Sequence, residues 1–403
     1  MIWLPCNEQE SRFFFAFPKI GFSYFWYFLF IFSFFSGGCY AGTTKVRVYG
    51  KERMQLKISR IDQSHLGAKS IFYIDGEIVG EPGKRHMRNQ MYVEAFFPRE
   101  QKHPWPIVFF HGAGQTNLNW LITPDGRMGW ADYFVSKGYA VYLCEQPSRG
   151  RSAYHPEDNG PRMYHSLESL QRFMSAAGSW PQSARHTQWP GEGTMAFTDE
   201  TDRQFIASQV EYLPRNADSQ RLVLDCGVRL LREIGPAILI THSQAGPFGW
   251  LLADAVPELV RGVVALEPSG PPFSADLTCE KAQNYGIADL PMHYEPLMER
   301  PEDFRLQLLP SDDPERNSGW VLAEPAPKLV RLAGLPIFVV VSESSYHAGY
   351  DHLTSHVLSQ CGVEHEFIRL EEHGIRGNGH MMMLEKNNLE IADLILNRIE
   401  KIK

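Results

Sequence analysis

Hydrophobic positions in this chain gather in short uninterrupted runs rather than in alternating patterns. Five such runs stand at residues 106–110, 139–144, 237–240, 262–266 and 336–341. Continuous apolar strands are typical of a parallel sheet that helices cover on both faces. Segments with helical patterns separate the runs, and a last strand and helix are expected at residues 364–370 and 388–399. This alternation predicts an α/β fold with a doubly wound, mostly parallel sheet.

Three local patterns add detail to this expectation. Two apolar runs flank Asp75-Gly76, a dipeptide that suits the positive φ angles of a tight turn, so a β-hairpin is predicted there. A further strand is expected at residues 90–98, before Pro98 ends it. Helical patterns predict helices at residues 130–137 and 204–233.

Two long stretches lack clear periodicity, at about residues 153–235 and 271–330. Long irregular segments inside a compact domain usually carry function. We therefore expect residues 42–403 to form one catalytic domain, with these two stretches as cap or lid insertions.

The N-terminal part differs from the rest of the chain. Residues 13–35 are almost entirely apolar, with Lys19 as their one charge, and small residues follow at 36–38. The uninterrupted part, residues 20–35, is short for a membrane span and suits the apolar region of a signal peptide. Residues 1–41 are thus predicted to be a signal peptide or a retained N-terminal membrane anchor. The protein would be secreted, periplasmic or membrane-tethered.

Composition narrows the classes of function. The 403 residues are 43% hydrophobic, which is enough for a substantial core, and the net charge is −8 without any basic run. A nucleic-acid partner is therefore not expected. The sequence contains no C-x-x-C motif, so it gives no support for a zinc site. No sequence feature indicates the oligomeric state. Beyond the N-terminal segment the cysteines could form two disulfides or stay free; they are Cys144, Cys226, Cys279 and Cys361.

Ser243 is the candidate nucleophile. It lies in Thr-His-Ser-Gln-Ala, directly between an apolar strand and a helix. A sharp turn at such a point exposes the serine hydroxyl, and the backbone N–H of the next residue, Gln244, can bind an oxyanion. Thr241 and Ala245 replace the two glycines of the G-x-S-x-G pattern, so the motif is imperfect.

A second oxyanion donor is expected from the loop that follows the strand at 106–110. Its sequence is His-Gly-Ala-Gly, and glycines allow the main chain to approach a substrate oxygen closely. The position of this loop, after a strand that precedes the nucleophile in the chain, favours the N–H of Ala113.

The candidate base is His380, in a Gly-rich loop between the last strand and the last helix. A loop there can bring an imidazole to the serine at the edge of the sheet. The competing histidines are His347, His352, His365 and His373, and His242 is expected to be structural.

The acid that orients the base has two candidates from the residues alone. Glu267 follows the strand at 262–266, and Glu343 follows the strand at 336–341. Carboxyl ends of parallel strands face the ligand side of such a sheet, so both positions suit the role. The sequence pattern alone does not distinguish between these two glutamates.

Several of these segments resemble a group of secreted bacterial esterases of the α/β-hydrolase superfamily that carry a His-Ser-Gln elbow. In that group the acid follows the strand after the elbow, which implies Glu267 over Glu343. The resemblance extends over about residues 85–400, and its pieces are residues 90–93, 123–130, 150–153, 242–244, 267–268 and 377–383, with 387–388 and 392–396.

One departure concerns the oxyanion loop. The bacterial enzymes carry two adjacent cysteines where this chain has Ala113 and Gly114, so substrate preference does not carry over. The resemblance implies a serine esterase that cleaves a small-molecule carboxylic ester through an acyl-enzyme, without metal or cofactor. A lactonase, an acyltransferase, another metabolite-modifying hydrolase and a non-catalytic binding protein on this fold are the alternatives.

Overall fold

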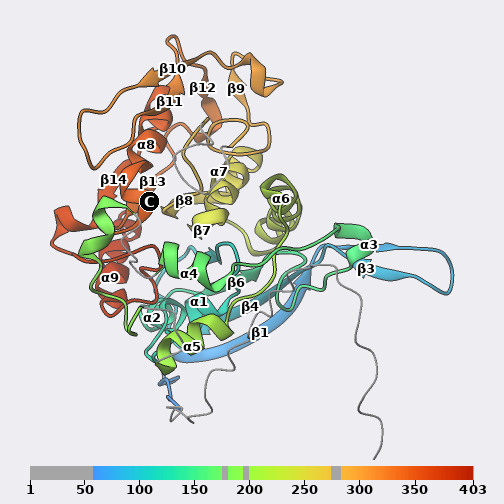
Figure 1. Ribbon diagram of the computed structural model, residues 1–403. Helices are drawn as coiled ribbons and strands as arrows, with labels where there is room; N and C mark the ends of the chain where they lie inside the picture. Colours follow the sequence, from blue (N-terminus) through green and yellow to red (C-terminus); the bar gives the residue numbers. More distant parts are fainter. Residues whose placement is uncertain (1–57, 175–179, 194–198, 274–282, 403) are drawn as a thin grey trace, which may run out of the picture. The chain divides into compact units, whose positions relative to one another are not determined.

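A mostly parallel sheet of eight strands organises the chain (Figure 1). The computed structural model describes residues 58–174, 180–193, 199–273 and 283–402, all within one compact unit. The strand order is β1-β4-β6-β5-β7-β8-β13-β14. Neighbours from β6 to β14 run parallel, whereas β4 pairs antiparallel with both β1 and β6. The predicted doubly wound, mostly parallel sheet is confirmed.

The strands of this sheet are β1 (Leu66–Ile74), β4 (Met91–Pro98), β5 (Ile107–Phe110), β6 (Val141–Glu145), β7 (Ala237–His242), β8 (Val260–Leu266), β13 (Ile337–Val341) and β14 (Glu366–Arg369). Short strands form three separate pairs: β2 (Glu77–Val79) with β3 (His86–Arg88), β9 (Tyr294–Glu295) with β12 (Lys328–Leu329), and β10 (Leu306–Leu309) with β11 (Gly319–Leu322). The α-helices are α1 (Leu118–Leu121), α2 (Trp130–Ser136), α3 (Pro156–Asn159), α4 (Leu167–Met174), α5 (Glu200–Ala207), α6 (Asn216–Ile234), α7 (Gly246–Ala255), α8 (Asp351–Gln360) and α9 (Asn388–Ile399).

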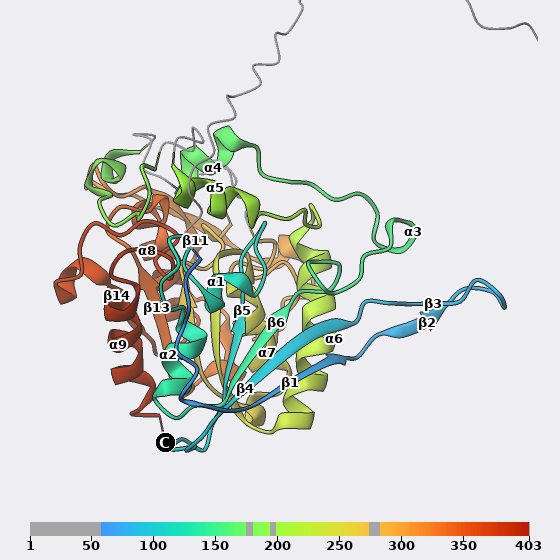
Figure 2. The same cartoon turned by 90° about the horizontal axis from the view of Figure 1, so that it is seen from below.

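Helices cover both faces of the sheet, and each face has its own core (Figure 2). Successive residues of β5 show the division: Val108 packs with α6, α7 and α8, whereas Phe109 packs with α2 and α9. Successive side chains of a strand point to opposite faces, so a strand that is buried on both must be apolar throughout. This is the physical reason for the uninterrupted apolar runs.

The parallel register brings the ends of four strands to one edge of the sheet. Phe110 of β5 pairs with Thr241 of β7, and His242 pairs with Leu266 of β8. Leu266 in turn pairs with Val340 of β13. The loops after β5, β7, β8 and β13 therefore begin side by side, and all of the predicted site residues except His380 lie in them.

The predicted hairpin around Asp75-Gly76 differs from the structure. Both residues have positive φ, 57° and 98°, as the turn required, but β1 pairs with β4 and β2 pairs with β3. Asp75-Gly76 thus interrupts one arm of a longer hairpin whose tip lies between β2 and β3. The dipeptide gave the backbone conformation correctly, whereas the pairing depended on a strand farther along the chain.

The helix predicted at 204–233 is two helices. α5 ends at Ala207, and α6 begins only at Asn216, after Pro214. Proline lacks an N–H and disfavours helical backbone in the residue before it, so it separates the two. The longer helix, α6, packs against α7 on one face of the sheet.

Three of the four cysteines left open above are described, and they are free and buried: Cys144, Cys226 and Cys361. Cys279 and the predicted signal or anchor segment at 1–41 lie outside the described residues. Within the described ranges, none of the helices has both the length and the apolarity that a membrane crossing requires.

Candidate active site

Ser243 lies at a sharp turn between β7 and α7, in left-handed backbone with φ of 54°. Its carbonyl accepts a 3.0 Å hydrogen bond from the N–H of Ser269, which ties the turn to the loop after β8. A Cβ on Gly246 would lie only 2.3 Å from Cβ of Pro268, so the approach of the two loops requires a glycine there. A non-glycine residue at positive φ is uncommon and strained, and such residues cluster at active sites and in tight turns.

His380 and Glu267 form a buried hydrogen-bonded pair. Nδ1 of His380 lies 2.5 Å from Oε2 of Glu267, although the residues are 113 positions apart. Since a carboxylate oxygen accepts, this hydrogen bond favours the tautomer with the proton on Nδ1, which leaves the lone pair of Nε2 free. The side chain of His380 is 1% exposed and that of Glu267 is fully buried.

The Glu267 carboxylate has further donors. The N–H of Ser342 donates to Oε1 at 2.8 Å, and the Ser345 hydroxyl donates to Oε2 at 2.7 Å. Burial raises the pKa of Glu267 to about 7, while nearby His347 and these donors act in the opposite direction. The carboxylate is thus fixed in the orientation that meets His380.

Glu343, the alternative acid, lies elsewhere. Its carboxylate accepts from Nη1 of Arg376 at 3.1 Å and from the N–H of Gly377 at 2.9 Å. It holds the start of the loop that carries His380 rather than the imidazole itself. The structure therefore brings Glu267, and not Glu343, into contact with His380.

A second histidine, His347, stacks on the candidate base. Its ring lies parallel to that of His380, with 4.9 Å between the centroids. His347 bonds Asp351 through Nδ1 at 3.1 Å and the Tyr350 hydroxyl through Nε2 at 3.0 Å. Burial lowers the pKa of His380 well below its usual range, and His347 adds to this effect. The surroundings thus favour the neutral imidazole that a general base requires.

His242, beside the nucleophile, contacts His380 through the main chain. Its Nε2–H donates to the His380 carbonyl at 3.0 Å, and the two rings lie 4.6 Å apart. His242 is 1% exposed and joins the Ser243 turn to the loop of the base. The structural role expected of it fits this contact.

The loop after β5 lies against the nucleophile. A Cβ on Gly112 would lie 3.0 Å from Cβ of Ser243, so a larger residue would crowd this approach. Ala113 follows directly, and Gly114 has φ of 66°. The loop therefore brings the N–H of Ala113 to the same side of the sheet as that of Gln244.

Residues from the first predicted insertion lie over this region. A Cβ on Gly114 would meet the His165 ring at 2.7 Å and Gln209 at 3.2 Å. Trp180 donates from Nε1 to the Ser344 carbonyl at 2.9 Å, and its ring packs edge-on against Tyr346. The Tyr346 hydroxyl in turn lies 3.5 Å from Nε2 of His380.

Two of the segments that carry the family resemblance contact each other. Arg127 donates to the carbonyls of Leu384, Glu385 and Lys386, at 3.0–3.1 Å, just after the His380 loop. It also donates to the Asn388 side chain at 2.9 Å. The segment at 123–130 thus anchors the loop of the candidate base.

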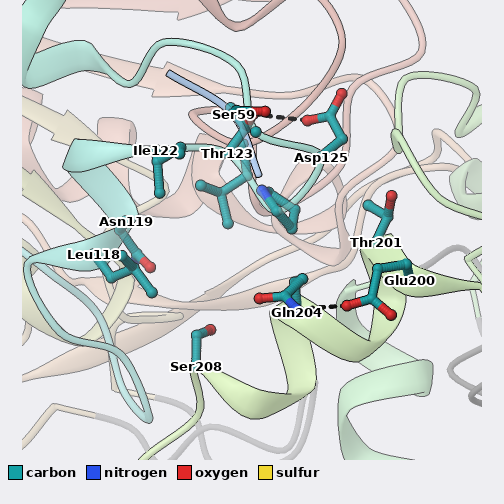
Figure 3. A pocket seen from close by; sticks show the side chains of 13 residues that line it. Ser59, Leu118, Asn119, Ile122, Thr123, Asp125, Glu200, Thr201, Gln204 and Ser208 are labelled. Atoms are coloured by element: carbon teal, nitrogen blue, oxygen red, sulfur yellow. Dashed lines mark hydrogen bonds between the residues drawn. The ribbon is translucent and has the colours of Figure 1, made fainter. Parts of the chain in front are cut away.

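One cavity of about 410 Å³ opens between the loop after α1 and helix α5 (Figure 3). Its lining includes Thr123 and Asp125, which bond each other, and Glu200 and Gln204, which also bond each other. Ser243, His380 and Glu267 are not part of this lining. The segment at 123–130 therefore borders a cavity that is separate from the candidate triad.

Two groups of described residues hold three ligand atoms within 4.8 Å of one another, the arrangement a metal ion requires. They are Glu267 with His347 and His380, and His86 with His155 and Asp158. In the second group the Asp158 carboxylate already pairs with His86 at 2.6 Å and with Arg88 at 2.9 Å.

Sequence reasoning missed several residues that support the site. Ser342 and Ser345 hold the acid, and Glu385 accepts from the N–H of Gly379 and from His186, next to His380. The polar run Ser-Glu-Ser-Ser after an apolar strand was a usable signal for the two serines. Glu385 had no comparable signal, because its partners come from distant segments.

Comparison with known proteins identifies relatives of the whole chain. No family model matches the chain. A fungal protein, probable secreted lipase phiG of Fungal sp. (strain ATCC 74256), is 41% identical over 336 residues, covering 82% of this chain and 89% of its own. A solved structure of a novel bacterial esterase superposes with a TM-score of 0.55 at 22% identity, covering 86% of this chain and 99% of that one, and shows the same fold. The chain therefore has the α/β-hydrolase fold and belongs to the family of the probable secreted lipase phiG.

Proposed function

We propose that the protein is a secreted serine hydrolase that cleaves carboxylic esters through an acyl-enzyme. The observation that carries this proposal is the buried His380–Glu267 pair beside the strained turn at Ser243. The fungal relative is named a probable secreted lipase and the bacterial neighbour an esterase, which supports the same chemistry here.

In the proposed mechanism, Ser243 Oγ attacks the ester carbonyl while Nε2 of His380 takes the hydroxyl proton. The N–H groups of Gln244 and Ala113 stabilise the oxyanion of the tetrahedral intermediate. Glu267 holds the imidazole in the required tautomer and stabilises the imidazolium as it forms. His380 then gives the proton to the leaving alcohol. In the second half of the reaction, water gives a proton to His380 as it attacks the acyl-enzyme, and His380 returns this proton to Ser243 Oγ.

The insertion predicted at about residues 153–235 is proposed as the cover of the substrate site up to the start of α6, which packs against α7 on the sheet, and 271–330 is proposed as a second insertion. The contacts of His165 and Gln209 with Gly114, and of Trp180 with Tyr346, support a cover from the first segment. Residues 1–41 are proposed as the export signal, which N-terminal sequencing of the mature protein tests.

The test of the proposed function compares wild type with Ser243→Ala. Wild type should react with a fluorophosphonate probe, hydrolyse p-nitrophenyl esters and give an acylated Ser243 peptide in mass spectrometry with a slow substrate. Ser243→Ala should lose all three, while Ser359→Ala, an exposed serine on α8, should keep them. An inactive, unlabelled wild type, or an active Ser243→Ala, contradicts the proposal.

A panel of acyl chain lengths, with water and alcohols as acceptors, then identifies the substrate. Free acid as the main product indicates hydrolysis, whereas a new ester indicates acyl transfer. Lactones in the same panel test ring opening.

A further inference from the structure

Arg149 is a buried cation in the turn after β6. Arg149 is 2% exposed and forms no ion pair with a carboxylate among the described residues, although Glu145 attracts it at longer range. Burial lowers the pKa of Arg149 to about 9, so the guanidinium stays protonated at neutral pH. A buried charge without a counter-ion is costly, so the hydrogen bonds that it makes must compensate for lost water.

The guanidinium bonds both parts of the candidate oxyanion hole. Nη1 donates to the Gly112 carbonyl at 3.0 Å, and Nη2 donates to Oε1 of Gln244 at 3.1 Å. A third acceptor is Oε1 of Gln146, at 3.3 Å from Nη2. The planar fork of arginine thus joins the loop after β5 to the loop after β7, in a geometry that lysine cannot reproduce.

The bond to Gly112 fixes the orientation of Ala113. The Gly112 carbonyl and the Ala113 N–H belong to one planar trans peptide, so they point in opposite directions. His111 donates to the same carbonyl from Nδ1 at 3.1 Å, because its Nε2 accepts from the Gln146 N–H. With its carbonyl held by two donors, this peptide cannot rotate, and the Ala113 N–H points away from Arg149.

The hydrogen bond from Arg149 to Gln244 fixes the side chain of the residue whose backbone N–H is the second candidate oxyanion donor. Oε1 of its side chain accepts from Arg149, while Nε2 donates to Oδ1 of Asn216, the first residue of α6, at 3.1 Å. The side chain is thus held at both ends. The backbone N–H of Gln244 belongs to the first turn of a helix, where N–H groups have no acceptor within the helix.

We propose that Arg149 is a positioning residue that aligns the Ala113 and Gln244 N–H groups into one oxyanion hole. This inference rests on the proposed function. It gives Arg149 a positioning role in addition to the roles proposed for Ser243, His380 and Glu267. Ala113 and Gly114 cannot form a disulfide, so the conformation of this loop depends on noncovalent contacts such as the hydrogen bond from Arg149 to Gly112.

The test measures kinetics and transition-state binding in Arg149→Met, which keeps the length of the side chain and removes the fork. We expect kcat for p-nitrophenyl butyrate to fall about 100-fold with little change in KM, the size of effect that misplaced catalytic groups produce. A trifluoromethyl ketone forms a hemiketal whose oxyanion occupies the hole, so its Ki should rise by the same factor. The Ki of the matching methyl ketone should stay unchanged.

Two variants separate positioning from general instability. Arg151→Met, in the same turn, removes ion pairs with Glu94 and Glu145 but no bond to Gly112 or Gln244, so it should lower Tm and leave kcat unchanged. Arg149→Lys should remain impaired, because one ammonium cannot serve both acceptors. Active-site titration corrects every value for the folded fraction.

The outcomes are distinct. An active wild type with an unchanged kcat in Arg149→Met overturns the role of Arg149 alone. A wild type without esterase activity and without fluorophosphonate labelling overturns the proposed function and this inference together. If Arg149→Met does not fold, Gln244→Leu decides: a lower kcat with a matching rise in the trifluoromethyl ketone Ki supports the proposal, and unchanged values overturn it.

Discussion

Oε2 of Glu267 lies 2.5 Å from Nδ1 of His380 and also accepts from the Ser345 hydroxyl at 2.7 Å. The carboxylate is therefore held from two sides, and its geometry does not depend on the imidazole alone. Glu267, the candidate acid, and Glu343, its competitor, can therefore be compared directly by mutation.

Glu267→Gln should reduce kcat on the order of 10⁴-fold, because an amide can stabilise the wrong histidine tautomer and cannot stabilise the imidazolium. Glu343→Gln is the matched control: it weakens the contacts to Arg376 and Gly377 and should cost far less activity. Steady-state kinetics on a p-nitrophenyl ester decide between the two. Collapse of kcat in Glu343→Gln alone would show that the acid is misassigned.

The pH dependence of kcat/KM should report the buried pair as a unit. Burial raises the pKa of Glu267 to about 7, so the pair takes up a proton as the pH falls through that value. Nε2 of His380 then no longer serves as a free base, wherever the proton resides. Activity should be constant above about pH 7 and fall about tenfold per pH unit below it.

Glu267→Gln provides the control for this profile. Without the carboxylate, the acid limb of its residual activity should move to lower pH, because burial lowers the pKa of His380. An unchanged limb in this variant would mean that the titrating group is not this pair.

Arg127→Met should loosen the loop that carries His380. The variant leaves the carbonyls of Leu384, Glu385 and Lys386 without this donor, which should lower the free energy of unfolding by about 1–3 kcal/mol. Urea unfolding measures the change, and kcat should fall with it. Arg127→Lys should recover only part of the loss, since an ammonium lacks the spread of the guanidinium donors.

Cys144, Cys226 and Cys361 should react with a thiol reagent only after unfolding. All three are free and buried, and burial raises the pKa of each thiol, which lowers its reactivity in the native state. Alkylation with and without urea, read by mass spectrometry of the peptides, measures this. A disulfide between any two of these cysteines would contradict the expectation.

The sheet was predictable because burial on both faces leaves a direct trace in the sequence, as the runs around Phe109 and Val339 show. Pairing was less predictable: β1 pairs with β4 because of residues beyond the Asp75-Gly76 turn, which local propensity does not include. The break between α5 and α6 had a visible cause in Pro214, which outweighed the surrounding helical pattern.

The candidate site was partly predictable for a similar reason. Chain order and strand ends led to Ser243, His380 and two candidate acids. Residue pattern alone left Glu267 and Glu343 open, and only the family resemblance favoured Glu267. The side-chain distances that separate the two glutamates come from the structure. The bonds of Arg149 depend on three loops meeting at one edge, so its role emerged only in three dimensions.

All predicted parts of the candidate site except His380 lie at the ends of neighbouring strands, and this has a consequence for exchange between relatives. Backbone ladders between β5, β7, β8 and β13 set the spacing of Ala113, Ser243 and Glu267, whereas the proposed cover lies in the segment between β6 and α6. A chimera that receives this segment from a relative should thus keep its reaction chemistry and acquire the donor's choice of ester. Reaction chemistry and ester preference would then belong to different segments of one chain and could change independently.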